Sequence, residues 1–173
     1  MTSFKIGGMG RDNSAARFLA GQDSWSLPPS PFEQIVRQLA EGKKTGDWMW
    51  FVFPQIEGLG RSVQAKKYAI RSTEEVVAYL DDSQLGPRYF DCLAIVAGHL
   101  LAAANPEDLW KALVGIFGDI DARKFKSSIT LFGAVASTLT TNRAVSVALL
   151  VDKLHAAGLR PCQATLDWLE RQD

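Results

Sequence analysis

The feature that most restricts the fold of this chain is a series of helix start signals with no strand pattern between them. In Ser30-Pro31-Phe32-Glu33, an N-cap hydroxyl, a proline at the first helical position and a capping glutamate stand at the required spacing. Ser72 and Glu75 repeat the capping box, and Asn105-Pro106 repeats the cap followed by proline. No stretch alternates apolar and polar residues as a half-buried strand does. The sequence therefore predicts an all-α protein.

The start signals and the apolar spacing predict a compact single-domain bundle of about seven to nine helices. The domain is expected to span residues 14–173, after a flexible tail formed by residues 1–13. Gly86-Pro87 is expected to break the chain between two helices. The segment Trp48–Phe53 has the aromatic content of a strand, but Asp47 before it and Pro54 after it favour a short helix. The other expected helices are 14–22, 30–41, 72–80, 88–104, 105–118, 121–138, 142–157 and 161–171.

Composition narrows the class of protein. A chain of 173 residues with 47% hydrophobic residues can bury one core, and its zero net charge argues against diffuse attraction to nucleic acid. No window has the roughly 18 apolar residues of a membrane span, and no signal peptide precedes the first helix. Cys92 and Cys162 lack metal-ligand spacing and are expected to be buried free thiols, and neither His99 nor His155 has acidic or cysteine neighbours typical of a metal site. We expect a cytoplasmic protein with no metal, cofactor or membrane partner.

Residues 46–62 form the most unusual segment. Four aromatic residues fall within six positions and are followed by Gly58-Leu59-Gly60-Arg61-Ser62 at an expected helix start. Aromatic faces beside backbone N–H groups and a guanidinium suit a flat, anionic, nucleotide-like ligand. The structural alternative is that the aromatics pack in the core and the glycines make a tight turn, with Ser62 as the N-cap. The candidate ligand-binding residues here are Trp48, Trp50, Gln55, Gly58, Gly60, Arg61 and Ser62.

A second candidate cluster lies on the helix expected from Asp121. Lys124, Ser127 and Ser128 fall on neighbouring helical turns, so an ammonium and two hydroxyls could project into one phosphate-binding site. A Ser–Lys catalytic pair is another interpretation, although the motif known from penicillin-binding enzymes runs in the opposite order. The structural alternative is that the serines bond to the preceding turn or face another helix, Asp121 caps the helix and Lys126 is solvated.

These motifs resemble those of an uncharacterised bacterial family catalogued as domain of unknown function 1810. The resemblance extends from about Ser14 onward and implies a compact all-α domain, without any established activity or catalytic residue. A histidine often precedes the first tryptophan in that family, whereas Asp47 stands there in this chain. The matching segments are Trp48–Gln55, Gly58–Ser62, Tyr68–Ile70, Tyr79-Leu80, Leu85–Arg88 and Lys124–Phe132.

Three functional hypotheses follow. In the first, both clusters form one pocket of a small-molecule-binding protein or enzyme, which requires Arg61 and Lys124 to face the same side of the fold. In the second, the chain is a helical protein–protein interaction module without catalysis, with an exposed apolar patch above about 400 Å² and no polar cavity. The third, a nucleic-acid-binding protein, depends on a modest basic cluster mixed with acids, so nucleic acid is not the expected partner. That cluster consists of Arg61, Lys66, Lys67, Arg71 and Arg88.

Overall fold

The computed structural model describes residues 15–26, 30–102 and 105–172, and these contain nine helices. Extended pairing among them is limited to one isolated bridge between Ile56 and Ile70. The all-α prediction is therefore confirmed, with the helix count at the upper end of the expected range. The helices are α1 (Ala16–Ser24), α2 (Pro31–Ala40), α3 (Met49–Val52), α4 (Val63–Lys67), α5 (Thr73–Asp81), α6 (Leu85–Leu101), α7 (Pro106–Ala136), α8 (Asn142–Ala156) and α9 (Gln163–Glu170).

Local hydrogen bonds explain where several helices begin. The side chains of Ser30, Ser72 and Asn105 each accept a hydrogen bond from the backbone N–H three residues later, at the starts of α2, α5 and α7. Ser62 and Thr141 cap α4 and α8 in the same way. Each cap satisfies a backbone donor that has no acceptor inside its own helix. The N-cap predictions at Ser30, Ser72 and Asn105 are confirmed. The predicted capping box at Ser72 is wrong in its second half, because the Glu75 carboxylate accepts from the Arg71 backbone N–H and from Arg17.

The expected break at Gly86-Pro87 is wrong, because both residues lie in the first turn of α6. Proline is tolerated there, since its missing N–H would have no helical acceptor in any case. The Asp82 carboxylate instead accepts hydrogen bonds from the backbone N–H groups of Gln84 and Leu85 at distances of 2.8 and 2.9 Å. The predicted flexible tail, residues 1–13, lies outside the described residues.

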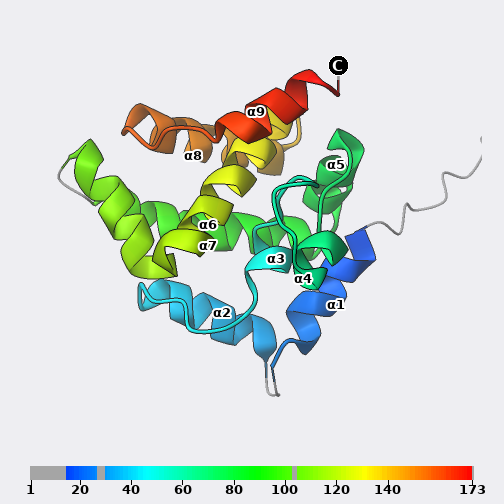
Figure 1. Ribbon diagram of the computed structural model, residues 1–173, viewed down its shortest axis with the longest axis horizontal. Coiled ribbons are helices and arrows are strands. Elements are labelled where there is room, and N and C mark those ends of the chain that lie inside the picture. Colours follow the sequence, from blue (N-terminus) through cyan, green and yellow to red (C-terminus); the bar gives the residue numbers. More distant parts are fainter. Residues whose placement is uncertain (1–14, 27–29, 103–104, 173) are drawn as a thin grey trace, which may run out of the picture.

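Helix α6 lies at the centre of the molecule and packs against α2, α5, α7 and α8. Figure 1 shows α1 and α2 below α7, and α8 and α9 above it, with α3 and α4 beside its second half. Helix α7 turns sharply at Gly118, where φ is 76° and ψ is 163°, so it consists of two helices joined at a kink. The sequence-based expectation that one helix ends at Gly118 and another begins soon after it is confirmed.

A buried hydrogen-bond network holds the short helix α3 in place. The Gln22 amide donates to the Phe51 carbonyl oxygen and to the Tyr79 hydroxyl, both at 2.9 Å, and the Tyr79 hydroxyl donates to the same carbonyl at 3.0 Å. All three side chains are buried, and Phe51 packs edge-on against Tyr68. Because these contacts fix α3 relative to α1 and α5, they also fix the position of Trp50 within it.

Candidate functional site

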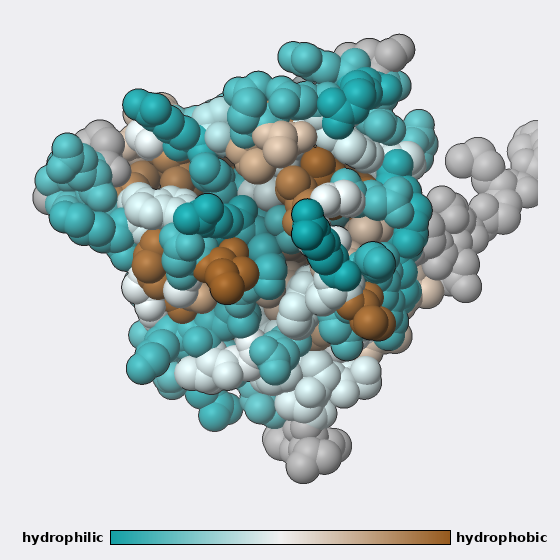
Figure 2. Space-filling model, in the orientation of Figure 1, coloured by the Kyte–Doolittle hydropathy of each residue, from teal (hydrophilic) through white to brown (hydrophobic). Residues whose placement is uncertain are grey.

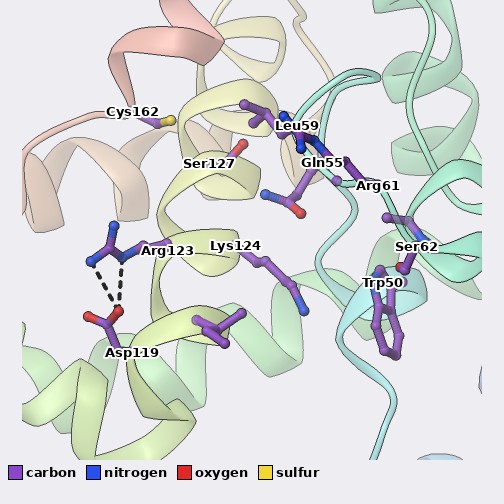
Figure 3. Close-up of a pocket in the computed structure, with 13 residues that line it drawn as sticks. Trp50, Gln55, Leu59, Arg61, Ser62, Asp119, Arg123, Lys124, Ser127 and Cys162 are labelled. Atoms are coloured by element: carbon purple, nitrogen blue, oxygen red, sulfur yellow. Dashed lines mark hydrogen bonds and ion pairs between the residues drawn. The ribbon is translucent and has the colours of Figure 1, made fainter.

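A pocket of about 710 Å³ lies between the loop that follows α3 and the second half of α7. In Figure 3 the Gln55 and Lys124 side chains reach towards each other's segment across the opening, whereas Arg123 and Asp119 extend from α7 in the opposite direction; Cys162 approaches from the segment before α9. The loop contributes mainly polar side chains, whereas α7 contributes charged ones together with exposed Ile120. The lining residues are Trp50, Gln55, Leu59, Gly60, Arg61, Ser62, Ala65, Asp119, Ile120, Arg123, Lys124, Ser127 and Cys162.

Lys124 is held in place on one side of this pocket. Its ammonium donates to Asp121 at 2.6 Å and lies 4.6 Å from the centre of the Trp50 ring. Figure 3 shows its side chain extending from α7 towards Trp50. Asp121 also pairs with Lys44 at 2.7 Å, and the side chains of these three ionic residues are at most 19% exposed. One carboxylate thus joins two lysines, and this arrangement carries a net positive charge.

The environment of Asp121 keeps its carboxylate ionised. Burial by itself would raise the pKa of Asp121, but the hydrogen bonds and charges of Lys124 and Lys44 outweigh burial and lower that pKa below its ordinary value. The expectation that Asp121 caps a helix is wrong, since it lies within α7 and its side chain bonds to lysines. Lys44 could not be linked to this site from sequence, because it lies 77 positions before Asp121.

Two arginines complete the charged lining. Arg61 is exposed, and no hydrogen bond or ion pair joins its side chain to another residue in the described part of the chain. Arg123 pairs with Asp119 one helical turn earlier, with an Nη2–Oδ2 distance of 3.0 Å, and both side chains are more than half exposed. Arg61 can therefore bind an anion without breaking an ion pair, whereas Arg123 must first leave its surface ion pair with Asp119.

Three polar side chains supply uncharged hydrogen-bonding groups. The Gln55 amide is directed towards α7 in Figure 3 and bonds to no other described side chain. Ser62 Oγ accepts from the backbone N–H of Ala65, so its own hydroxyl hydrogen is available to the pocket. Ser127 is almost fully buried and its Oγ lies 2.8 Å from Thr165 Oγ1, so its hydroxyl is less available to a ligand than that of Ser62.

The structure brings most of the sequence-predicted site residues together. Seven of the ten candidates line the pocket, so the tryptophan-rich segment and the Lys124 cluster converge, with Arg61 and Lys124 on the same cavity. Their role in ligand binding stays a prediction. The seven are Trp50, Gln55, Gly60, Arg61, Ser62, Lys124 and Ser127.

Three candidates lie away from the pocket. Trp48 is fully buried, and its indole N–H donates to Gln38, because its ring faces the core rather than the opening. Ser128 is also fully buried and bonds to the Tyr89 hydroxyl at 3.3 Å, which agrees with the expectation that these serines face other helices. Gly58 has a φ of 93°, which explains a glycine in the turn without any ligand.

Other lining residues were not among the sequence-based candidates. Asp119 and Arg123 both precede Lys124 on α7, and their i,i+4 spacing was the only local signal for them. Cys162 reaches the pocket because α9 packs against α7, and it is only half-buried. The prediction of a buried thiol is therefore wrong for Cys162 and confirmed for Cys92, where burial raises the thiol pKa well above its ordinary value.

The other expectations concern metals, membranes and nucleic acid. Over residues 15–26, 30–102 and 105–172, no group of three or more His, Cys, Asp or Glu side chains could hold a metal ion. Within the same ranges, no helix combines the length and the apolar character needed to cross a bilayer. Two members of the basic cluster are engaged in ion pairs, Arg71 with Glu57 and Arg88 with Asp23.

The fold and the pocket define a class, an all-α domain with a cationic, partly apolar pocket on one face. Hydrophobic side chains reach the surface among hydrophilic ones on the face drawn in Figure 2.

Residues 12–156 match the family described as protein of unknown function (DUF1810), and the chain belongs to this family. The resemblance found in the sequence motifs is thereby confirmed.

A solved structure supports the fold. The chain is similar to the crystal structure of the conserved hypothetical protein Rv1873 from Mycobacterium tuberculosis, with 32% sequence identity and a TM-score of 0.68. The similarity covers 90% of this chain and 95% of the mycobacterial one. A search of curated proteins found no significant match.

Proposed function

We propose that this protein binds an anionic, nucleotide-like small molecule in the pocket between α7 and the loop after α3. The observation that carries the proposal is the convergence of Arg61, Arg123 and Lys124 on one cavity in a chain whose net charge is zero. Cations gathered beside apolar lining are typical of sites for phosphorylated or carboxylated metabolites.

The pocket offers separate surfaces for the two parts of such a ligand. Arg61 presents a planar guanidinium suited to bidentate contacts with a phosphate or carboxylate. Ile120 and Leu59 are 71% and 39% exposed and provide apolar area against which a flat ring can pack. Lys124 already covers one face of Trp50, so we assign Trp50 to holding Lys124 rather than to stacking on that face of the ligand.

The proposal is limited to binding. A Ser–Lys catalytic pair would need a contact between Lys124 and Ser127, whereas Lys124 donates to Asp121 and Ser127 bonds to Thr165. No reaction is therefore assigned to the site. We extend the proposal to a bacterial cytoplasmic setting, supported by the similarity to a mycobacterial protein and by the free thiols of Cys92 and Cys162.

A thermal-shift screen against nucleotides, sugar phosphates and other anionic metabolites tests this function, because a ligand that binds the native state raises the melting temperature. The shift produced by a hit should shrink in both Arg61→Ala and Lys124→Ala. Lys66→Ala removes a nearby exposed cation outside the pocket lining and should leave the shift unchanged. Absence of any shift, or a shift retained in both pocket variants, would contradict the proposal.

The interaction module is the second candidate function, favoured by one observation. Val145 and Leu149 are 42% and 57% exposed and lie one turn apart on α8. Two exposed apolar side chains are a weaker argument than the charged pocket. If the ligand screen fails and the protein retains a partner that a Leu149→Asp variant loses, this second function would replace the first.

A further inference from the structure

The charge of the pocket specifies the charge of its ligand. Among the described lining residues, Arg61, Arg123 and Lys124 are cations and Asp119 is the one carboxylate, so the lining has two net positive charges. A ligand group with a single negative charge would leave one of these charges unbalanced when water is displaced. A group that carries two negative charges would balance both.

The three cations differ in how firmly they are held. Lys124 is fixed by Asp121 and Trp50, and Arg61 is not engaged by any described side chain. The Arg123–Asp119 pair joins side chains that are 70% and 55% exposed. A pair this exposed contributes little to stability, so an incoming anion can take Arg123 from Asp119.

We infer that the anionic group of the ligand is a terminal phosphate monoester, held between Arg61 and Lys124 and completed by Arg123 when Asp119 releases it. This inference rests on the function proposed above and narrows the class of ligand. Near neutral pH a monoester carries close to two negative charges and three terminal oxygens, enough acceptors for two guanidinium groups, an ammonium and the Gln55 amide. A phosphodiester or a carboxylate carries a single charge and fewer free oxygens.

In this arrangement Asp119 acts against ligand binding. If the Arg123–Asp119 pair only stabilised the helix, removal of the carboxylate would not increase the affinity. The Asp119 carboxylate competes with the phosphate for Arg123, and its negative charge repels the phosphate. Asp119→Asn should therefore tighten monoester binding about two- to fivefold. Asp108→Asn removes a carboxylate from another exposed pair of α7, with Lys111, and should leave the affinity unchanged because Asp108 does not line the pocket.

Titration calorimetry with matched probes tests the inference. The probes are AMP, GMP, CMP and UMP, each compared with its own 5′-methyl phosphodiester. The monoester of any nucleotide that binds should bind about tenfold more tightly than its diester, in line with the strength of charge-assisted hydrogen bonds. In Arg123→Ala the affinity for the monoester should fall by a larger factor than the affinity for the diester, so the ratio of the two should shrink.

The pH dependence provides a second readout. The charged and titratable groups among the described lining residues are Arg61, Arg123, Lys124, Asp119 and Cys162. Asp121 and Lys44 lie behind Lys124, and no histidine is among these groups. Monoester binding should weaken as the pH falls below about 6, where the phosphate dianion takes up a proton and becomes a monoanion, whereas diester binding should not change there. A monoester that binds equally at pH 5 and pH 7.5 would overturn the inference.

The outcomes separate the two proposals. Equal affinity for a monoester and its diester, or no gain in Asp119→Asn, would overturn the phosphate-monoester inference and leave the anionic pocket standing. Failure of all eight probes, together with a negative metabolite screen, would overturn both.

Discussion

Asp121 illustrates at the residue scale how a single side chain organises this site. It accepts from Lys124 at 2.6 Å and pairs with Lys44 at 2.7 Å, and the Lys44 side chain is only 8% exposed. Lys44 also lies 5.2 Å from the centre of the Trp48 ring. A carboxylate between two poorly solvated ammonium groups offsets their repulsion, so its removal affects both the stability of the fold and the position of Lys124.

Asp121→Asn should lower the free energy of unfolding by about 2–4 kcal/mol, because two partly buried lysines lose their shared counter-charge. Urea denaturation at pH 7 measures this change. Asp119→Asn breaks a surface pair of the same helix and should change stability by about 1 kcal/mol or less. Equal effects of the two substitutions would show that the lysine–aspartate arrangement does not support the fold.

The lowered pKa of Asp121 sets the direction of its pH dependence. Because the folded-state pKa lies below the unfolded value of about 3.9, its contribution is present above that pH and is lost as the pH falls through the folded-state pKa. In Asp121→Asn the acid-induced loss of stability should therefore be shallower than in the unsubstituted protein. Denaturation at pH 5 and pH 3 would detect the difference, and identical losses would contradict it.

The kink in α7 is the main feature at the scale of an element. Gly118 adopts a φ of 76° and a ψ of 163°, a region that residues with a Cβ rarely enter. Asp119, Ile120, Arg123 and Lys124 all follow the kink and line the pocket. The direction in which α7 continues after Gly118 therefore determines where the charged lining stands.

Gly118→Ala should destabilise the protein by about 1–3 kcal/mol, through backbone strain alone. No atom lies within 4 Å of an added Cβ at Gly118, so a steric clash does not contribute. Gly115 has equally open surroundings but a helical backbone, and Gly115→Ala should stabilise the protein by about 0.5–1 kcal/mol. Thermal unfolding of the pair distinguishes strain from side-chain volume, and a shift of the same sign in both would refute the argument.

At the scale of the whole molecule, the core around α5 and α6 contains buried titratable groups. Burial raises the pKa of the Tyr79 and Tyr89 hydroxyls and of the Cys92 thiol well above their ordinary values. The neutral forms fit this core, where Tyr89 stacks on Phe132 with ring centres 4.2 Å apart. The folded state therefore retains protons that the unfolded chain releases in alkali.

Stability should fall as the pH rises above about 8.5, where the unfolded chain ionises Cys92, and more steeply above about 10, where it ionises the tyrosines. The raised folded-state pKa values give this sign, since the contribution of each group is fully present below its unfolded pKa and is lost as the pH rises towards its folded-state pKa. Each ionised group adds a slope of about 1.4 kcal/mol per pH unit. Urea denaturation from pH 7.5 to 10.5 measures the effect. Tyr79→Phe should reduce the steepness above pH 10, and a flat profile would count against the buried-proton explanation.

The sequence by itself determined the fold class and most helix boundaries. Caps such as Ser30 and Ser72 act on a backbone N–H three residues away, so the information needed to recognise them is local. The same holds for the break at Gly118. The alternation of apolar and polar residues that half-buried strands require was absent from the sequence. The two segments that line the pocket could also be recognised, because their unusual residues are close together in sequence.

Tertiary structure alone decided which of these residues meet. Trp48 and Trp50 lie two positions apart, yet Trp48 faces the core and Trp50 the pocket. The neighbouring serines also differ, since Ser127 lines the pocket and Ser128 does not. Cys162 reaches the pocket, and Lys44 reaches Asp121, only through contacts between elements distant in sequence. The physical reason is that a hydrogen-bonded cap involves neighbours along the chain, whereas the side of a helix that faces a cavity depends on how the whole core is packed.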